Sequence, residues 1–292
     1  MIAGNGKVDM SLSLASLNSG SNGNCYYVGS STDAVLVDAG LSSAETLRRM
    51  KQLGIATGQL RGIFISHEHT DHIRGLAGLS STLGVPVYIN EKTRSALKLR
   101  LRRQQVITLR AGEPVQLGTL EVLPFSKTHD AADPVSFIIR HGQLTAGVFT
   151  DIGRTCAEVK RRFRECHAAI LESNYDPDML RDGPYPAVLK TRISGGSGHL
   201  SNQEALELFS NHRSPNLSLL LLGHLSAENN SPDRALEVFR PHAGNVQVAV
   251  AGRYAATTIH LVTNEISSAN SLPPNTGRSM AKQLRLFDLE TE

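Results

Sequence analysis

The run His67-Glu68-His69-Thr70-Asp71-His72 constrains this chain more than any other feature of its sequence. It follows the apolar residues 62–66, which read Gly-Ile-Phe-Ile-Ser and predict a buried strand. A loop that joins a strand end to a helix lies where α/β enzymes hold their ligands. Imidazole and carboxylate groups suit zinc, manganese or iron, and the lack of cysteine argues against a purely structural zinc site. The run therefore predicts a metal site in an α/β protein.

Short apolar segments bounded by turn residues recur along the chain. They predict strands over residues 12–17, 25–28, 34–37, 62–66, 85–89, 120–125, 135–140, 144–150, 168–171, 217–223 and 246–251. Capping signals predict helices over residues 43–53, 201–211 and 231–239. Strands that come first in hairpins and then alternate with helices predict a mixed sheet with helices on its outer faces.

Composition excludes several classes of protein. With 40% hydrophobic residues in a chain of 292, a sizeable core is expected. The net charge of +3 neither demands nor excludes a nucleic-acid partner. Three cysteines without CxxC spacing predict no disulfide framework. No segment is apolar for long enough to cross a bilayer and no signal peptide is apparent, so we expect a cytoplasmic protein without a membrane partner.

The motif His67-x-His69-x-Asp71-His72 resembles the signature of the metallo-β-lactamase fold superfamily. The other conserved motifs of that superfamily have counterparts here in the same order, each at the end of an expected strand. These counterparts are Asp38, His129, Asp151 and His224. The resemblance implies a four-layer αββα sandwich, which we expect to occupy residues 1–264.

The resemblance also implies a site for two divalent metal ions, zinc or manganese in preference to iron. The implied ligands are His67, His69 and His129 for one ion, Asp71, His72 and His224 for the other, and Asp151 for both. Asp38 would brace the metal-binding loop, and Asp71 counts among the catalytic residues. Two ions about 3.5–4 Å apart can share a hydroxide, which would attack a phosphodiester at neutral pH.

Asp151 and two further residues resemble residues of the nucleases of this fold. True β-lactamases of the fold usually have cysteine where this chain has Asp151, and an oxygen ligand suits phosphate chemistry better. Glu172 and His199 resemble a pair that protonates the leaving oxygen in tRNA 3′-processing endonucleases. His199 is therefore the expected general acid and Glu172 its orienting partner. The alternative, a surface histidine at a helix start and a glutamate in a salt bridge, remains open.

A finer resemblance is to the bacterial YycJ/WalJ-type family, carried by residues 16–27, 133–135, 172–175, 183–186 and two Gly-His-Leu-Ser motifs. Members are regarded as 5′-to-3′ DNA exonucleases, which implies that function in DNA replication or repair. The loop with Ser19, Ser21 and Asn22 would cradle a substrate phosphate. A hydrolase of cyclic phosphodiesters or thioesters, an RNA-processing nuclease, an oxygen-using iron protein and a non-catalytic adaptor remain as alternatives.

Residues 265–292 differ in composition from the rest of the chain. Their Ser, Asn, Pro and Gly content first predicts a flexible linker. The following Gln283-Leu284-Arg285-Leu286-Phe287 resembles the peptide by which bacterial replication and repair proteins bind the DNA sliding clamp. Gln283, Leu284, Leu286 and Phe287 would make the contacts. Alternatively, the apolar side chains of this peptide pack onto the domain.

Basic residues are dense over residues 92–103 and 160–164. Such stretches either follow a phosphate backbone or form the solvated face of a helix. The sequence leaves both interpretations open.

Overall fold

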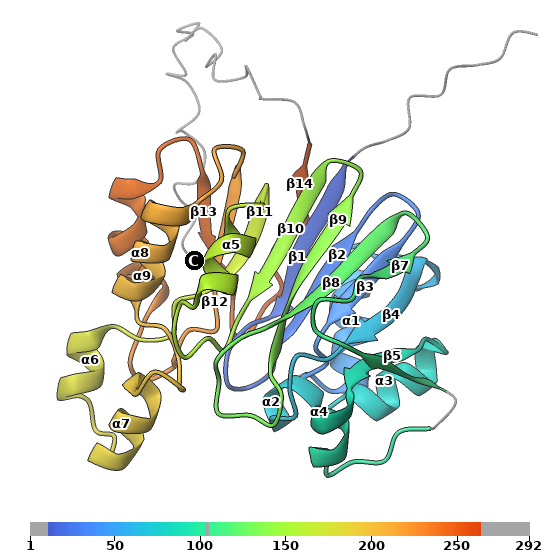
Figure 1. Cartoon of the computed structure of the whole chain (residues 1–292), viewed down its shortest axis with the longest axis horizontal. Coiled ribbons are helices and arrows are strands. Elements are labelled where there is room, and N and C mark those ends of the chain that lie inside the picture. The colour runs from blue at the N-terminus through green and yellow to red at the C-terminus, as the bar shows by residue number, and fades with distance from the viewer. Residues whose placement is uncertain (1–10, 103–104, 264–292) are drawn as a thin grey trace, which may run out of the picture.

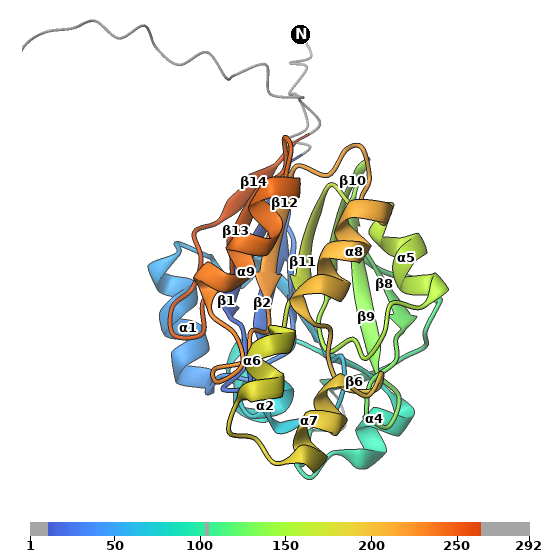
Figure 2. The same cartoon turned by 90° about the vertical axis from the view of Figure 1, so that its left-hand side faces the viewer.

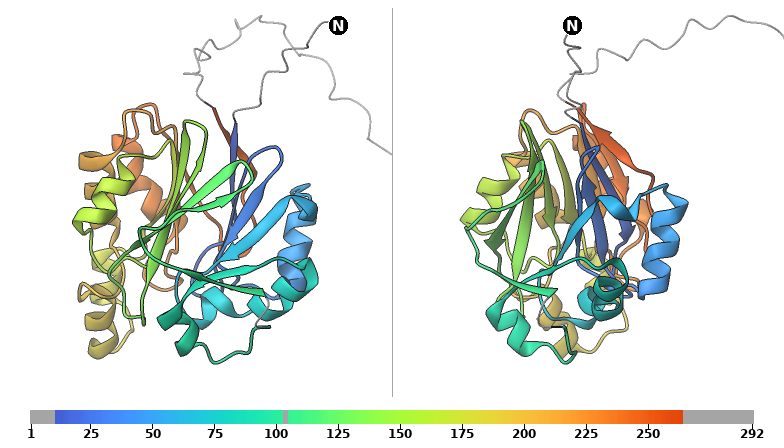
Figure 3. Two further views of the ribbon diagram at one scale, coloured as in Figure 1. Left: turned by 45° about the vertical axis from the view of Figure 1, so that its right-hand side comes forward. Right: turned by 90° about the vertical axis from the view of Figure 1, so that its right-hand side faces the viewer.

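The apolar segments of the chain form two seven-stranded sheets that pack face to face in the computed structural model, which describes residues 11–102 and 105–263 (Figures 1 and 3). The first sheet has the order β14-β1-β2-β3-β4-β5-β6. Its strands are β1 (Leu12–Asn18), β2 (Cys25–Gly29), β3 (Ala34–Val37), β4 (Leu60–Phe64), β5 (Val87–Asn90), β6 (Val106–Leu109) and β14 (His260–Val262).

The second sheet has the order β13-β12-β11-β10-β9-β8-β7. Its strands are β7 (Val115–Leu117), β8 (Leu120–Ser126), β9 (Val135–His141), β10 (Leu144–Phe149), β11 (Ala168–Glu172), β12 (Leu219–Gly223) and β13 (Gln247–Val250). All the strands expected from the sequence are present, whereas β6, β7 and β14 were not expected.

Helices cover the outer faces of both sheets (Figure 3). The first sheet is covered by α1 (Ser43–Gln52) and α3 (Leu76–Leu83), and the second by α5 (Ala157–Phe163), α8 (Asn202–His212) and α9 (Pro232–Phe239). At one end of the sandwich lie α2 (Thr70–Ile73), α4 (Glu91–Ala96), α6 (Pro177–Asp182) and α7 (Ala187–Ser194), and short 3-10 turns span Thr57–Gln59 and Arg240–His242 (Figure 1). The expected helices α1, α8 and α9 are present, each with the side-chain N-cap that its sequence predicts.

Three apolar layers hold this arrangement together. One fills the space between the sheets and includes the fully buried Phe64 and Phe137, whose rings meet edge to face. The other two lie under the helices: Met50 of α1 packs below the first sheet, and Phe209 of α8 packs on the second. Because successive side chains of a strand point to opposite faces, each strand contributes to the layer between the sheets and to the layer under the helices. The expected four-layer αββα sandwich is confirmed.

Each sheet is antiparallel on one side and parallel on the other. In the first sheet β1, β2 and β3 form hairpins, and β3 to β6 run parallel. In the second sheet β8, β9 and β10 alternate in direction, and β10 to β13 run parallel. The carboxyl ends of β3, β4, β8, β10, β11 and β12 consequently lie at one end of the sandwich. Within the described residues, no helix is long and apolar enough to cross a bilayer.

Candidate metal centre

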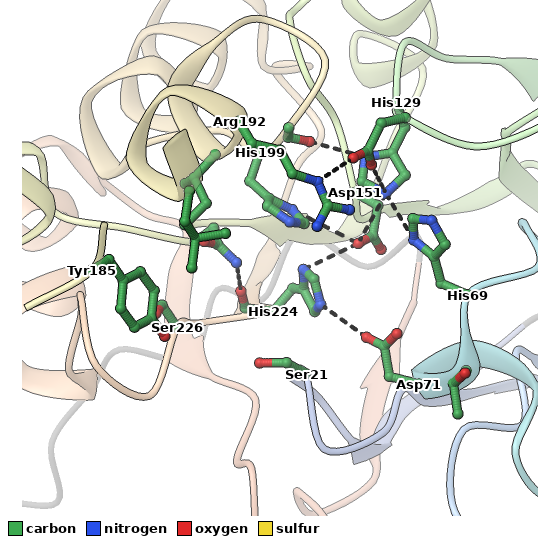
Figure 4. A pocket seen from close by; sticks show the side chains of 16 residues that line it. Ser21, His69, Asp71, His129, Asp151, Tyr185, Arg192, His199, His224 and Ser226 are labelled. Carbon is green, nitrogen blue, oxygen red and sulfur yellow. Dashed lines mark hydrogen bonds and ion pairs between the residues drawn. The ribbon is translucent and has the colours of Figure 1, made fainter. Parts of the chain in front are cut away.

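The loops at that end of the sandwich bring together the polar residues of six strand ends around one pocket, which His69, Asp71, His129, Asp151 and His224 line directly (Figure 4). The residues concerned are Asp38 after β3, His67, His69, Asp71 and His72 after β4, His129 after β8, Asp151 after β10, Glu172 at the end of β11 and His224 after β12. Five sequence-distant segments therefore meet the His67–His72 run in space.

Three of these strand ends have a strained backbone. Asp38, Asp151 and His224 have φ values of 62°, 54° and 54°, and among the described residues no other non-glycine residue has a positive φ. Such conformations cost about 1–3 kcal/mol each and persist where the surroundings hold them in place. All three residues turn sharply out of a strand and aim a side chain into the site.

One group of ligand atoms comes from His67, His69 and His129, whose candidate donor atoms lie within 4.8 Å of one another. His67 Nε2 and His129 Nε2 lie 3.1 and 3.4 Å from His69 Nδ1. The other ring nitrogens are occupied: His67 Nδ1 lies 2.9 Å from Ser66 Oγ, and His129 Nδ1 lies 2.9 Å from the carbonyl oxygen of Gly198. These contacts orient the free Nε2 atoms toward a common point, as second-layer contacts do in metal sites.

A second group consists of Asp71, His72 and His224, again within 4.8 Å. His72 Nδ1 lies 2.7 Å from Asp38 Oδ2, which holds this ring. His224 Nδ1 lies 2.9 Å from Glu172 Oε1. In both histidines a carboxylate fixes Nδ1 and leaves Nε2 for the site.

Asp151 lies between the two groups. Its carboxylate is 3.2 Å from His72 Nε2 and 3.9 Å from His129 Nε2, and it also forms a ligand group with His67 and His72. Among the described residues, His224 Nε2 is buried and makes no hydrogen bond, and the buried Asp151 Oδ2, although 3.2 Å from His72 Nε2, lacks a hydrogen bond of normal geometry. Buried polar atoms are normally satisfied, so these two point to a missing partner. The nitrogen and oxygen donors present here fit divalent metal ions.

The electrostatics of the pocket favour cation-binding protonation states for the carboxylates and for two of the histidines. Burial lowers the pKa of His67 well below its usual value and that of His129 to about 4, so both rings are neutral near pH 7. Burial alone would raise the pKa of Asp71, but the charge of His72 lowers it to about 2. Burial likewise opposes ionisation of Glu172, whose pKa is nevertheless lowered to about 2 by His199. The carboxylates are therefore ionised.

At His72 and His224, burial lowers the pKa but the charge of Asp151 outweighs it, raising the pKa of His72 well above its usual value and that of His224 to about 10. A bound cation would therefore displace a proton from each of these two rings.

Glu172 and His199, for which the sequence predicts a proton-delivery role, lie in contact. The buried carboxylate of Glu172 lies 2.8 Å from His199 Nδ1 and accepts hydrogen bonds from the backbone N–H groups of Ile152 and Leu200, at 2.8 and 3.1 Å. His199 itself lines the pocket with a side chain that is 22% exposed. Because Nδ1 is engaged, Nε2 is the ring atom available to a bound molecule. Glu172 also contacts His224, a link that the sequence did not reveal.

The three residues of the loop expected to hold a phosphate have different surroundings. Ser19 is buried, and its hydroxyl accepts from the backbone N–H of His224 and contacts Tyr26 Oη. Asn22 donates from Nδ2 to the carbonyl oxygen of Arg253, outside the pocket lining. Ser21 does line the pocket. We therefore narrow the expected phosphate contact to Ser21, because the polar groups of Ser19 and Asn22 are used within the fold.

Two supporting residues carry no signal in the sequence. The buried Asn24 lies with Nδ2 3.1 Å from Asp71 Oδ2 and 3.0 Å from His72 Nε2. Lys127 is also buried, donates from Nζ to the carbonyl oxygen of Thr150 at 2.6 Å, and has a pKa lowered by burial. Neither matches a ligand motif, because each acts through a neighbour that only folding brings close.

Both basic stretches contain an arginine that pairs with a glutamate on its own helix, as Arg94 does with Glu91 on α4. In residues 160–164, Arg161 and Arg162 pair with Glu158 on the outer helix α5, which favours the interpretation as a solvated helix face. In residues 92–103, the described part begins with α4, and Asn90 at its N-cap donates to the carbonyl oxygen of Asp133 in the loop after His129. Gln283, Leu284, Leu286 and Phe287 lie outside the described residues.

Comparisons with known proteins agree with this geometry. Residues 33–224 match the model of a beta-lactamase superfamily domain. The chain is 35% identical over 229 residues to a Bacillus anthracis protein named exodeoxyribonuclease YycJ, covering 77% of this chain and 87% of that protein. It is 31% identical over 224 residues to exodeoxyribonuclease WalJ of Streptococcus pneumoniae, covering 75% and 83%.

A solved structure shares the fold at low identity. The metallo-beta-lactamase fold protein YhfI from Bacillus subtilis superposes with a TM-score of 0.67 at 16% identity, covering 85% of this chain and 98% of that one. The expected fold and family resemblance are thus confirmed, and divalent metal binding is a property of this fold family. The chain belongs to the beta-lactamase superfamily, in the same family of metal-dependent hydrolases as the exodeoxyribonucleases YycJ and WalJ.

Proposed function

We propose that this chain is a dimetal phosphodiesterase that digests DNA from the 5′ end in replication or repair. The observation that carries the proposal is the pair of three-residue ligand groups with the Asp151 carboxylate between them. The names of the relatives, both exodeoxyribonucleases, support DNA as the substrate.

The ligand assignment follows the two groups. His67, His69 and His129 would hold one zinc or manganese ion, Asp71, His72 and His224 the other, and Asp151 would contribute to both. When bound, such a pair supplies Lewis acidity and an activated water at neutral pH. Metal analysis of the purified protein identifies the ions.

The protein's own residues would orient the reaction. Asp38 and Glu172 hold the rings of His72 and His224 from behind. His199, held by Glu172 at Nδ1, would donate a proton from Nε2 to the leaving oxygen of the cleaved phosphodiester. An alkoxide is a poor leaving group, so this proton accelerates departure.

An end-labelling assay tests the proposal. The purified chain is incubated with Mn²⁺, Mg²⁺ or Zn²⁺ and with single-stranded DNA, double-stranded DNA or RNA labelled at one end. We expect early release of the 5′ label from DNA as short products, while 3′-labelled DNA shortens progressively. Asp71→Ala should abolish cleavage, and Asp178→Ala, an exposed carboxylate on α6, is the matched control.

Each contrary result has a distinct meaning. Early release of the 3′ label would reverse the proposed polarity, and cleavage of RNA alone would favour an RNA-processing nuclease. No metal-dependent cleavage of any nucleic acid would overturn the nuclease proposal. Cyclic dinucleotides and thioesters, offered in the same assay, test the small-molecule alternative.

We also propose that Gln283, Leu284, Leu286 and Phe287 bind the bacterial sliding clamp. An extended peptide with Leu and Phe anchors can enter an apolar groove, and a linker lets the enzyme reach DNA at the same time. Removal of the last ten residues should abolish binding to purified clamp and leave cleavage of short DNA intact. Loss of folding in the truncated chain would instead indicate that the peptide packs on the domain.

A further inference from the structure

The α6–α7 segment, residues 177–194, stands apart from the two helical layers at the end of the sandwich that holds the site (Figures 1 and 2). No residue of α7 is buried, and Val188 is 84% exposed. Most helices in proteins are stabilised by packing an apolar face, so α7 gains little from the core. Its position at the pocket therefore calls for a different explanation.

One face of this segment forms a wall of the pocket. Tyr185, Leu189, Arg192 and Ile193 line it, whereas Val188 does not. Spacings of three and four residues place Leu189, Arg192 and Ile193 on the same face of α7. Tyr185 lies between Pro184 and Pro186, which restrict the backbone on both sides of the ring. Figure 4 shows Tyr185 at the end of the pocket remote from His69, with His224 and Asp151 between them.

This wall differs chemically from the rest of the pocket. Apart from the histidines, the aromatic and branched hydrocarbon side chains lining the pocket are Tyr185, Leu189 and Ile193, and all of them come from the α6–α7 segment. The opposite end presents carboxylates and imidazoles. The pocket volume of about 420 Å³ lies in the range of small-molecule sites. With divalent ions held at that end, as proposed above, a matching ligand has an anionic group there and a flat, carbon-rich group at the other end.

Arg192 connects this wall to the loop that carries His129 through an ion pair with Asp130. Its Nε lies 2.6 Å from Asp130 Oδ2, next to His129 in sequence. The arginine side chain is 61% exposed and the aspartate 29%. Exposed ion pairs are weak, so a phosphate oxygen can replace the carboxylate as the partner of this guanidinium.

We propose that the pocket-lining face of the α6–α7 segment is the nucleotide-binding wall of the site: Tyr185 stacks on a nucleobase next to the cleaved phosphodiester, and Arg192 exchanges Asp130 for a neighbouring phosphate. This inference rests on the proposed function and specifies how the substrate is held. Stacking on an aromatic ring tolerates every base, because each base has a π-face. The wall therefore selects a nucleotide over a bare phosphodiester without selecting a sequence.

The test of Tyr185 compares normal DNA with DNA that carries tetrahydrofuran abasic residues near the 5′ end. Tyr185→Ala should raise KM for normal DNA about 5- to 100-fold, as expected for loss of one base–aromatic stack. On abasic DNA the wild type and Tyr185→Ala should have the same KM. Tyr185→Phe keeps the ring and should restore a wild-type KM, whereas Tyr185→Leu keeps apolar volume without a flat face and should behave like alanine.

Matched controls come from residues outside the pocket. Val188→Ala changes the same helix, and Tyr254→Ala removes a tyrosine that is 78% exposed and does not line the site. Both should leave KM on either DNA unchanged. Metal content and cooperative unfolding are measured for every variant, so that a folding defect is recognised.

The test of Arg192 uses salt. Arg192→Ala should raise KM on both DNAs and reduce the slope of log kcat/KM against log salt by about 0.7, the value for one lost contact to a single strand. Arg181→Ala, an exposed arginine of α6 outside the pocket, is its control.

The outcomes separate this inference from the proposed function. If the wild-type chain cleaves DNA, two results overturn the stacking role alone. One is a Tyr185→Leu variant with the same KM as Tyr185→Phe, and the other is a Tyr185→Ala variant whose KM rises equally on normal and abasic DNA. An unchanged salt slope in Arg192→Ala overturns the phosphate exchange. A wild-type chain that cleaves no nucleic acid overturns the proposed function and this inference together.

Discussion

Replacing His199 with alanine should slow cleavage of DNA far more than cleavage of an activated phosphodiester. His199 Nδ1 is held 2.8 Å from the buried Glu172 carboxylate, so Nε2 is oriented toward the pocket. General acid catalysis is worth about 10²- to 10⁴-fold, so kcat on DNA should fall by that factor. p-Nitrophenolate leaves without a proton, so the loss on bis(p-nitrophenyl) phosphate should be less than about tenfold.

Glu172→Gln gives a second measure of the same pair. The pKa of Glu172 is lowered from 4.5 to about 2 in spite of its burial, by the charge and hydrogen bond of His199 and the hydrogen bond of His224. That depression corresponds to about 3 kcal/mol in favour of the ionised carboxylate. Because several contacts share this energy, we expect a loss of about 10- to 100-fold in kcat on DNA for the glutamine variant.

The assay measures steady-state rates on both substrates, with metal content determined for each variant. His212→Ala, at the exposed end of α8, is the matched histidine control and should leave both rates unchanged. Equal losses of His199→Ala on DNA and on bis(p-nitrophenyl) phosphate would refute the general-acid role. Loss of bound metal in His199→Ala would instead identify this histidine as a ligand, which its 4.8 Å grouping with Asp151 and His224 also permits.

Two further predictions concern the metal centre and acid stability. Asp151→Asn should reduce the amount of metal bound per chain, because Asp151 adjoins both ligand groups. Mass spectrometry of metals measures this amount, with Asp178→Asn as the control. Retention of both ions by Asp151→Asn would contradict the shared role. Burial opposes ionisation of Asp33, but hydrogen bonds from Thr119 and Arg61 lower its pKa from 3.8 to about 2. The folded-state pKa lies below the unfolded value, so this stabilisation, about 2 kcal/mol, is present above about pH 4 and is lost as the pH falls through about 2. In urea unfolding, Asp33→Asn should be less stable than wild type above that window and should converge with it below; a constant difference would refute the assignment.

The sequence predicted the long elements because their signals are local. Each expected strand is an apolar run, and a run of that kind is buried on both faces in this sandwich. The strand β14 escaped prediction because it has three residues and Leu261 is 65% exposed. The helix α7 escaped because none of its residues is buried, so it has no apolar stripe to detect.

The same division applies to the candidate site. The sequence by itself predicted which side chains meet, through the resemblance that its motifs carry. His67, Asp151 and His224 each follow a strand, and parallel strands bring their carboxyl ends to one edge of a sheet. It did not determine that Ser19 turns inward while Ser21 faces the pocket, since both belong to one loop of small polar residues.

Only the tertiary structure decided the contacts made between distant segments. Glu172 joins His199 to His224 across 27 and 52 positions of the chain, and Lys127, after β8, reaches the carbonyl oxygen before Asp151, after β10. Tyr185 and Arg192 become pocket residues only because α7 is held across the strand ends. The candidate ligands thus follow from the family motif and its strand–loop pattern, whereas the surroundings that orient them and shape the pocket depend on packing between segments far apart in sequence.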